Sequence, residues 1–180
     1  ALQGQWNAWL KKQYGTTEAM KEAWKWVSVP LSGEQVTEGA FDAPVVFDGK
    51  RWILAKGTSA VRAAAEEGVL KVTVERGGDE YFPKIFRRIA VQKDKPYTVS
   101  FKVRRTQGEG SATLGFAVAD AKDGWRSLGV HQKLTAGKAW SQHSFAFIAA
   151  ESSDKAEIQF TRFPVGAFEI DELSFQSGAI

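Results

Sequence analysis

Aromatic side chains are the residues of this sequence with the clearest capacity for binding chemistry. The 180-residue chain holds seven Trp, 12 Phe and three Tyr, more rings than a core of this size requires. A flat indole or phenol ring can stack on the C–H face of a sugar, and neighbouring donors and acceptors then bond the hydroxyl groups. Outside the first 30 residues, the candidate rings are Trp52, Tyr81, Phe82, Trp125 and Trp140.

The positions of these rings predict different roles. Trp125 follows a predicted turn, where a large ring finds little core to enter, so we expect it to be exposed. Tyr81 and Phe82 are adjacent, so one of the two must face away from the core. Trp52 opens a predicted strand and is interpreted equally well as a binding ring or a packing residue, whereas packing is favoured for Trp140.

The segment 81–91 places hydrogen-bond donors beside two of these rings. If Ile85, Ile89 and Val91 face inward, at least one basic side chain of the segment faces outward; the candidates are Lys84, Arg87 and Arg88. The alternative is the ordinary solvated charge of an edge strand, which protects sheets against aggregation.

Patterns typical of catalysis and of metal binding are weak. The absence of cysteine excludes disulfides and thiolate metal sites, and two histidines exclude a His-rich zinc site. His131 and His143 are expected at the surface or in turns, and the adjacent Asp171 and Glu172 are expected on opposite faces of a strand, unable to share a site. The net charge of +3 is too small for a typical nucleic-acid footprint. We therefore predict no catalytic residues.

The periodicity of the chain predicts a short helical segment followed by strands. Residues 1–27 hold four of the seven Trp and read as two helices separated at Gly15, the second capped by Thr16 or Thr17. From about residue 36, many short alternating segments separated by turns predict an all-β sandwich or barrel. Residues 60–67 have a helical composition but lie between strands, so a strand or loop is equally expected there. We divide the chain into a helical segment at 1–30 and a β-sandwich at 31–180.

Several strands in order resemble the carbohydrate-binding modules of the family 4, 9 and 22 type. The matching segments are GVLKVTV at 68–74, YTVSF at 97–101, WSQHSFAF at 140–147 and FEIDELSF at 168–175. The resemblance implies a jelly-roll β-sandwich of two antiparallel sheets that binds β-glucan or xylan chains in a groove on one sheet. It also implies that the module itself is not an enzyme.

The resemblance assigns roles to particular residues. It implies an aromatic at Tyr81 or Phe82 and another at Trp125. It implies polar groove positions at Lys84 and Arg87 on one strand, where the family more often has Gln, and His131 and Gln132 on another. Basic residues in the groove would either tolerate an acidic glycan or donate more strongly. A structural calcium is implied between Glu38 and Asp171, with an absent site as the alternative.

The N-terminal stretch WNAWLKKQYGTTEAMKEAW at 6–24 resembles a helical segment of the (β/α)-barrel glycosidase clan. This resemblance implies a secreted, extracellular or periplasmic enzyme of which this monomeric module is a part; the alternative is that these helices dock on their own sandwich. The favoured function is a non-catalytic carbohydrate-binding module that targets an attached glycosidase to a polysaccharide. The alternatives are a structural or interaction domain that binds no sugar, and a small β-sandwich lyase or hydrolase.

Overall fold

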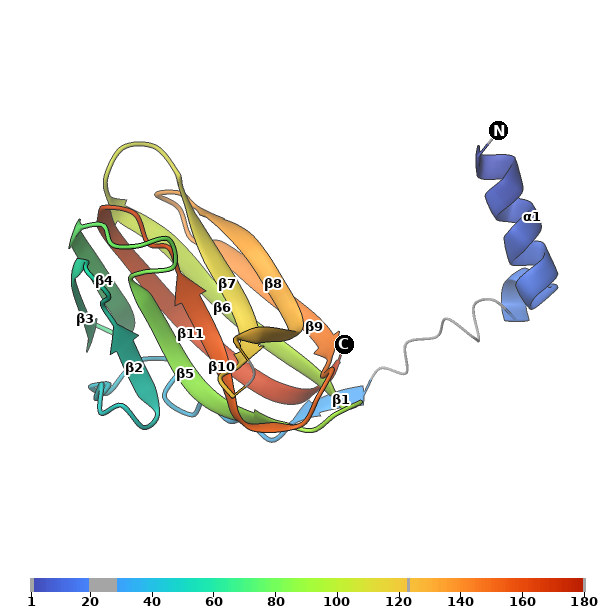
Figure 1. The fold of residues 1–180 in the computed structure, drawn as a ribbon, viewed down its shortest axis with the longest axis horizontal. Helices are drawn as coiled ribbons and strands as arrows, with labels where there is room; N and C mark the ends of the chain where they lie inside the picture. The colour runs from blue at the N-terminus through green and yellow to red at the C-terminus, as the bar shows by residue number, and fades with distance from the viewer. Residues whose placement is uncertain (1, 20–28, 123, 180) are drawn as a thin grey trace.

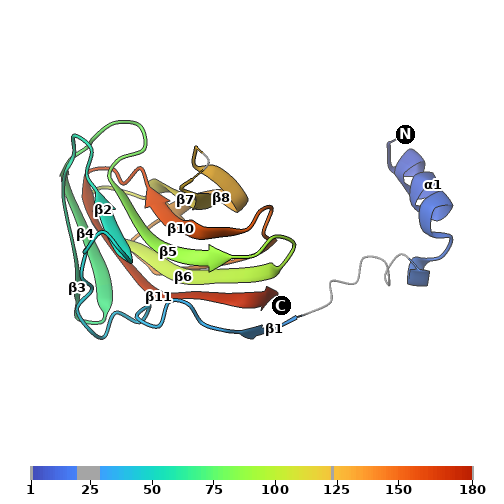
Figure 2. The same cartoon turned by 60° about the horizontal axis from the view of Figure 1, so that its bottom comes forward.

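The computed structural model describes residues 2–19, 29–122 and 124–179, which form one helix and a β-sandwich (Figure 1). Helix α1 covers Leu2–Tyr14 and is drawn apart from the sandwich in both ribbon views (Figures 1 and 2). The strands are β1 Val29–Ser32, β2 Trp52–Ala55, β3 Ala60–Glu66, β4 Val69–Arg76, β5 Lys84–Val91, β6 Pro96–Gln107, β7 Ala112–Asp120, β8 Arg126–Ala136, β9 Ser141–Ile148, β10 Ser153–Thr161 and β11 Gly166–Ala179.

The strands pair into two antiparallel sheets that face each other. Sheet A has the order β3-β4-β11-β6-β9, with β1 paired to β11, and sheet B has the order β2-β5-β10-β7-β8. Apart from the consecutive pairs β3-β4 and β7-β8, neighbours within each sheet come from distant parts of the chain, as the different colours of β5 and β10 show (Figure 2). The predicted all-β jelly-roll sandwich with a short N-terminal helix is confirmed.

The core fills the space between the sheets with side chains from alternate strand positions. In β6 the side chains of Tyr97, Val99, Phe101 and Val103 are all buried, as their alternation predicts. The Phe101 ring lies with its centroid 4.6 Å from that of Phe116, across from it in the other sheet. Much of the aromatic surplus of the sequence is therefore core.

Two local expectations are resolved by the backbone. Residues 60–66 form strand β3 paired to β4, so the tertiary pairing decides against the helical composition. The expected separation of Asp171 and Glu172 is wrong, because both carboxylates bond to Lys102 Nζ, at 3.1 and 2.8 Å. Glu172 has a φ of +51° at an irregularity in the pairing of β11 with β6, which interrupts the alternation.

The helical segment is described only in part. Thr16 Oγ1 accepts a hydrogen bond from Ala19 N at 3.0 Å, which agrees with the predicted cap of a second helix. The rest of that predicted helix, including Trp24 and Trp26, lies outside the described residues. Within the described parts of the chain, no helix has the length and apolarity needed to cross a membrane.

Gly39 gives the first stability test, because the loop after β1 lies directly against β11 there. A Cβ at this position would lie 1.6 Å from the carbonyl oxygen of Leu173, whose N–H donates to Gly39 O at 3.0 Å. We expect Gly39→Ala to lower the free energy of unfolding by at least about 2 kcal/mol, measured by urea denaturation. Gly77→Ala is the control, since a Cβ there meets nothing within 4 Å. Equal stability of the two variants would contradict this packing.

Candidate functional site

The outer face of sheet B, which points away from sheet A, carries a concentration of polar side chains. In β5 the buried Ile85 and Ile89 belong to the core, so the even-numbered positions 84, 86 and 88 point outward. The strand register then aligns outward residues in rows across the sheet. We call this surface the outer B face; its residues are Lys84, Phe86, Arg88, Glu157, Gln159, Gly115, Ala117, Ala119, His131 and Lys133.

The middle strand positions of the outer B face have small side chains. Gly115, Ala117 and Ala119 follow one another at alternate positions of β7, between the larger side chains of β10 and β8. Small residues let another molecule approach the backbone closely. Gly115 and Ala119 are themselves buried, with Thr161 over Gly115, so Ala117 is the position of this strip at which a flat or extended ligand can approach.

Trp125 leans over this face from the loop between β7 and β8. Gly124 and Trp125 both have positive φ, +58° and +64°. Ala121 N donates to Lys155 O at 3.3 Å, which ties the loop to the start of β10. The indole centroid lies 3.4 Å from Lys84 Nζ and 6.3 Å from the Phe86 ring, and half of the residue is exposed. The expected exposure of Trp125 is confirmed.

Beneath the ring, the outer B face contains buried polar groups. Gln159 Nε2 donates to Glu157 Oε2 at 3.0 Å, and Arg88 Nε lies 3.9 Å from Glu157 Oε1. Burial raises the pKa of Glu157, and the nearby Lys84 charge opposes this shift. Burial likewise lowers the pKa of Lys84, opposed by Glu157. Such groups require hydrogen-bond partners, which a polar ligand can supply.

The structure divides the seven predicted ligand-binding residues. It brings Lys84 and Trp125 together on the outer B face. Tyr81 is exposed, but the Arg162 guanidinium lies over its ring at 4.7 Å. Phe82 instead packs against Gly57, whose Cβ, if present, would approach the ring to 2.7 Å.

Three predicted residues lie on the inner side of sheet B. Trp52 of β2 and Arg87 of β5 are register partners, and both lie on the face of sheet B that carries Ile85 and Ile89. Both side chains are buried, because strand alternation turns them inward. The structure therefore does not support the predicted contact of these two side chains with a ligand. Gln132 pairs with the core residue Phe116, so it also leaves its strand on the inner side, at the exposed edge of the sheet.

Residues that the sequence interpretation missed complete the outer B face. They are Phe86, Glu157 and Gln159, together with Arg88, which the sequence offers as a candidate outward donor but the family resemblance does not place in the groove. The signal that could have found them is the alternation itself: with Ile85 and Ile89 inward, positions 84, 86 and 88 must be outward. The same reasoning applies to Glu157 and Gln159 between the buried residues of β10.

Arg87 joins three segments inside the edge of the sandwich. Its Nε donates to Glu38 Oε1 at 2.7 Å and its Nη2 donates to Gln35 O at 3.1 Å, while Trp52 Nε1 donates to the same Glu38 oxygen at 3.0 Å. Burial acts to raise the pKa of Glu38, but these bonds and the Arg87 charge outweigh it and leave the pKa below its ordinary value. The bridge fixes the loop after β1 against β5 and β2.

The two carboxylates expected to hold calcium are each bonded to a cation. Glu38 binds Arg87, and Asp171 lies 3.1 Å from Lys102 Nζ. Calcium takes six or more oxygen ligands. In the described part of the chain, no group of three or more His, Cys, Asp or Glu is placed to hold a metal ion. These residues as placed do not fit the ion, and calcium binding stays a prediction of the resemblance.

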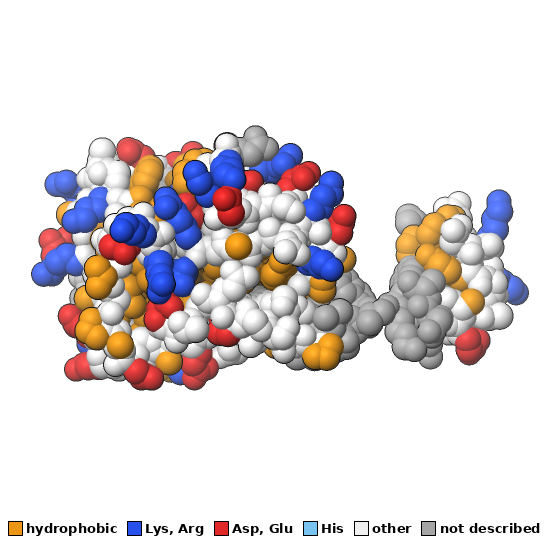
Figure 3. Space-filling view, turned by 90° about the horizontal axis from the view of Figure 1, so that it is seen from below, with side chains coloured by type: hydrophobic (Ala, Val, Ile, Leu, Met, Phe, Trp, Pro, Cys, Tyr) orange, Lys and Arg blue, Asp and Glu red, His pale blue; other side chains and the backbone are white. Residues whose placement is uncertain are grey.

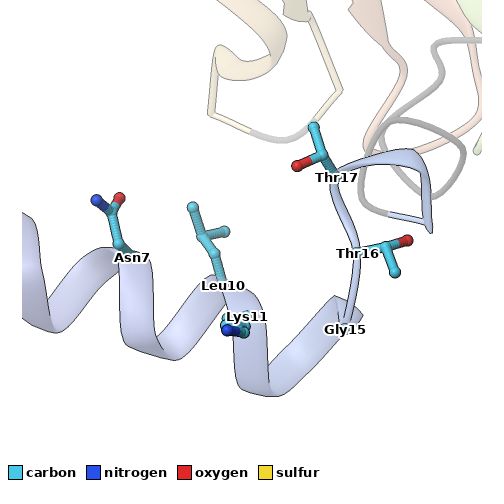
Figure 4. Close-up of a pocket in the computed structure, with 6 residues that line it drawn as sticks. All are labelled: Asn7, Leu10, Lys11, Gly15, Thr16 and Thr17. Atoms are coloured by element: carbon cyan, nitrogen blue, oxygen red, sulfur yellow. The ribbon is translucent and has the colours of Figure 1, made fainter.

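Two hollows lie elsewhere on the protein. One, of about 430 Å³, is lined by helix α1 and the turn after it, including Leu10, Lys11 and Thr17, with no aromatic ring among the described residues that line it (Figure 4). Another, of about 530 Å³, lies in the loop before β2 and reaches Trp52 and Glu38. Trp52 is only 2% exposed, so its ring offers no open face there.

Basic and acidic side chains are interspersed on the face of the sandwich in Figure 3.

Comparisons with known proteins identify related folds. Residues 33–162 match the model of a family described as a carbohydrate binding domain. A CBM4 domain of 16% identity has a TM-score of 0.70, covering 79% of this chain and 99% of that chain. The N-terminal cellulose-binding domain of β-1,4-glucanase C from Cellulomonas fimi has 16% identity and a TM-score of 0.60, with 81% and 97% covered. The CBM22-1 xylan-binding domain of Xyn10C from Paenibacillus barcinonensis has 15% identity and a TM-score of 0.56, with 85% and 97% covered. No curated protein matches the chain.

The Arg87 bridge predicts a specific loss of stability. We expect Arg87→Met to lower the free energy of unfolding by about 2 kcal/mol at neutral pH, because it leaves a half-buried carboxylate without its partner. Arg62→Met, which breaks an exposed pair with Glu75, is the control and should cost less than about 1 kcal/mol. Because the folded pKa of Glu38 is lowered, its contribution is present above pH 4.5 and lost as the pH falls through the folded pKa.

Denaturation of Glu38→Gln across this range supplies the second measurement. The variant should show a smaller loss of stability on acidification than the wild type, and an unchanged acid dependence would contradict the bridge. Denaturation of the wild-type protein in the presence of calcium and of EDTA tests whether calcium binds to the folded protein. The cation-paired carboxylates predict equal stability, whereas a calcium-dependent gain would show that these pairs open for the ion.

Proposed function

The chain belongs to the carbohydrate-binding domain family whose model spans residues 33–162, and we propose that it binds polysaccharide chains across the outer B face. The observation that carries this placement is the half-exposed Trp125 ring held above buried polar groups. We propose β-glucan or xylan-like chains as ligands. The cellulose-binding and xylan-binding descriptions of two domains of similar fold support this choice.

Binding follows from stacking and hydrogen bonding, with no covalent step. The open surface of the Trp125 indole buries the C–H face of one sugar unit. The 44% exposed Arg88 then donates to hydroxyl groups, while the buried Glu157, which accepts from Gln159, lies beside Arg88 and positions its side chain. The small side chain of Ala117 in β7 lets the chain lie close to the sheet. A site of this kind gives a Kd on the order of 10–100 μM, or about −5.5 to −7 kcal/mol.

We also propose that this non-catalytic module is joined to a glycosidase that it targets to its polysaccharide outside the cytoplasm. The resemblance of the N-terminal segment supports this arrangement. Trp6 and Trp9 of α1 stack with centroids 5.1 Å apart and remain about half exposed, so they present an apolar surface. In this account the module contributes binding as a monomer, and the attached domain contributes catalysis.

Affinity electrophoresis through gels that contain soluble β-glucan or xylan tests the proposed function. We expect retardation of the wild-type protein and a loss of affinity of about tenfold or more in Trp125→Ala, because the stacked area is removed. Trp140→Ala is the matched control. Its ring lies against Arg104 and Lys102 on sheet A, with the guanidinium 4.4 Å from its centroid, so its binding should be unchanged.

The outcomes separate the alternatives. Retention of full affinity by Trp125→Ala would remove the outer B face from the site. No retardation of the wild-type protein in any gel would contradict the proposed function and leave a structural domain. Release of reducing sugar by the isolated chain would instead indicate a catalytic activity.

A further inference from the structure

Lys84 has an unusual environment for a lysine at the surface of a sheet. The residue is only 8% exposed, and its Nζ lies between two rings, 3.4 Å from the Trp125 centroid and 4.5 Å from that of Phe86. An ammonium group has three N–H donors. Among the described residues, it has neither a hydrogen-bond acceptor nor an ion-pair partner within 4.0 Å. The Nζ atom is not itself fully enclosed, so water is its remaining hydrogen-bond partner, and a ligand can take that place.

The nearest acidic group is already engaged with other side chains. Glu157 accepts a hydrogen bond from Gln159 and lies 3.9 Å from Arg88 Nε. The charges on the outer B face are therefore unequal. Of its residues named above, Lys84, Arg88 and Lys133 are cationic, and Glu157 is the acid that opposes them.

We propose that the polysaccharide bound on this face carries a carboxylate, and that Lys84 is the residue that recognises it. This inference rests on the proposed function and names its ligand class, a uronic-acid-containing glycan. Lys84 Nζ lies on the covered side of the indole, so a carboxylate that projects from a stacked sugar past the edge of the ring can approach the ammonium. A carboxylate there supplies the missing acceptor and a negative charge in addition to that of Glu157. A hydroxyl group supplies only the acceptor.

Arg88 adds a second cation to this environment. It extends from the same face of β5 two residues after Phe86, and its side chain is 44% exposed. The pair of cations brackets the Phe86 ring along the strand. A carboxylate on a glycan that runs over Phe86 is therefore attracted from both sides.

The carboxylate can belong to a main-chain sugar or to a branch, and the experiment distinguishes these sources. The binding of the full chain is measured on polygalacturonate, whose main chain is acidic, and on glucuronoxylan, whose branches are acidic. Each polymer is paired with its carboxyl-reduced counterpart, which keeps the same linkages without the charge. We expect at least about tenfold tighter binding to one acidic polymer than to its reduced form. This advantage should shrink between about 20 mM and about 500 mM NaCl.

Lys84→Met is the decisive variant. It keeps the length and apolar contacts of the side chain beneath the indole but removes the ammonium group. We expect the ratio of acidic to reduced binding to fall at least about threefold, with the remaining preference due to Arg88. Lys12→Met removes one charge from the exposed surface of α1 and should keep the wild-type ratio. Thermal unfolding of both variants verifies that they fold.

Three results would overturn the inference. Equal binding of an acidic polymer and its reduced form, for both pairs, overturns it while leaving the proposed function intact. A folded Lys84→Met protein that keeps the wild-type ratio also overturns it. No binding to any acidic, reduced or neutral polymer overturns the proposed function, and this inference with it.

Discussion

The alternation of side chains along strand β5 is the constraint on which the rest of the structure depends, because this strand serves two surfaces at once. Ile85, Ile89 and Val91 pack in the core, while the even-numbered positions Lys84, Phe86 and Arg88 form part of the outer B face. A shift of one residue in register would exchange the two sets and place Lys84 among the core phenylalanines. The same rule acts in β10, where Glu157 and Gln159 lie between buried residues. The stability of the sandwich thus fixes which groups can meet a ligand.

The inward charge of this strand shows how the edge of the sheet is held. Arg87 falls on the core side, and Glu38 and the backbone of Gln35 supply its partners there. The bridge joins the long loop after β1 to the sheet, and Trp52 completes it through its indole N–H. The Arg87 guanidinium therefore supplies the positive charge that holds the Glu38 carboxylate in place. The face used for binding is left free of this structural role.

Much of the fold could be predicted from the sequence because strand alternation and turns are local signals. The strands around Phe101 and the exposed ring of Trp125 were predicted on this basis. The groove position of Arg87 comes from the family resemblance, whereas the alternation with Ile85 and Ile89 places Arg87 inward. Trp52 was left open, since no local signal tells a buried indole with a carboxylate partner from an exposed one. The approach of Trp125 to Lys84 is set by a loop over β10, a long-range contact that sequence spacing does not contain.

An NMR titration shows whether carbohydrate contacts the outer B face. Hexasaccharides of β-1,4-glucan and β-1,4-xylan, and a glucuronic-acid-substituted xylo-oligosaccharide, would be added to the ¹⁵N-labelled protein. The account predicts that the largest amide and indole shifts fall on Phe86, Trp125, Glu157 and Gln159. Shifts that cluster instead around Trp140 on sheet A, or beside Trp52 in the loop before β2, would contradict it.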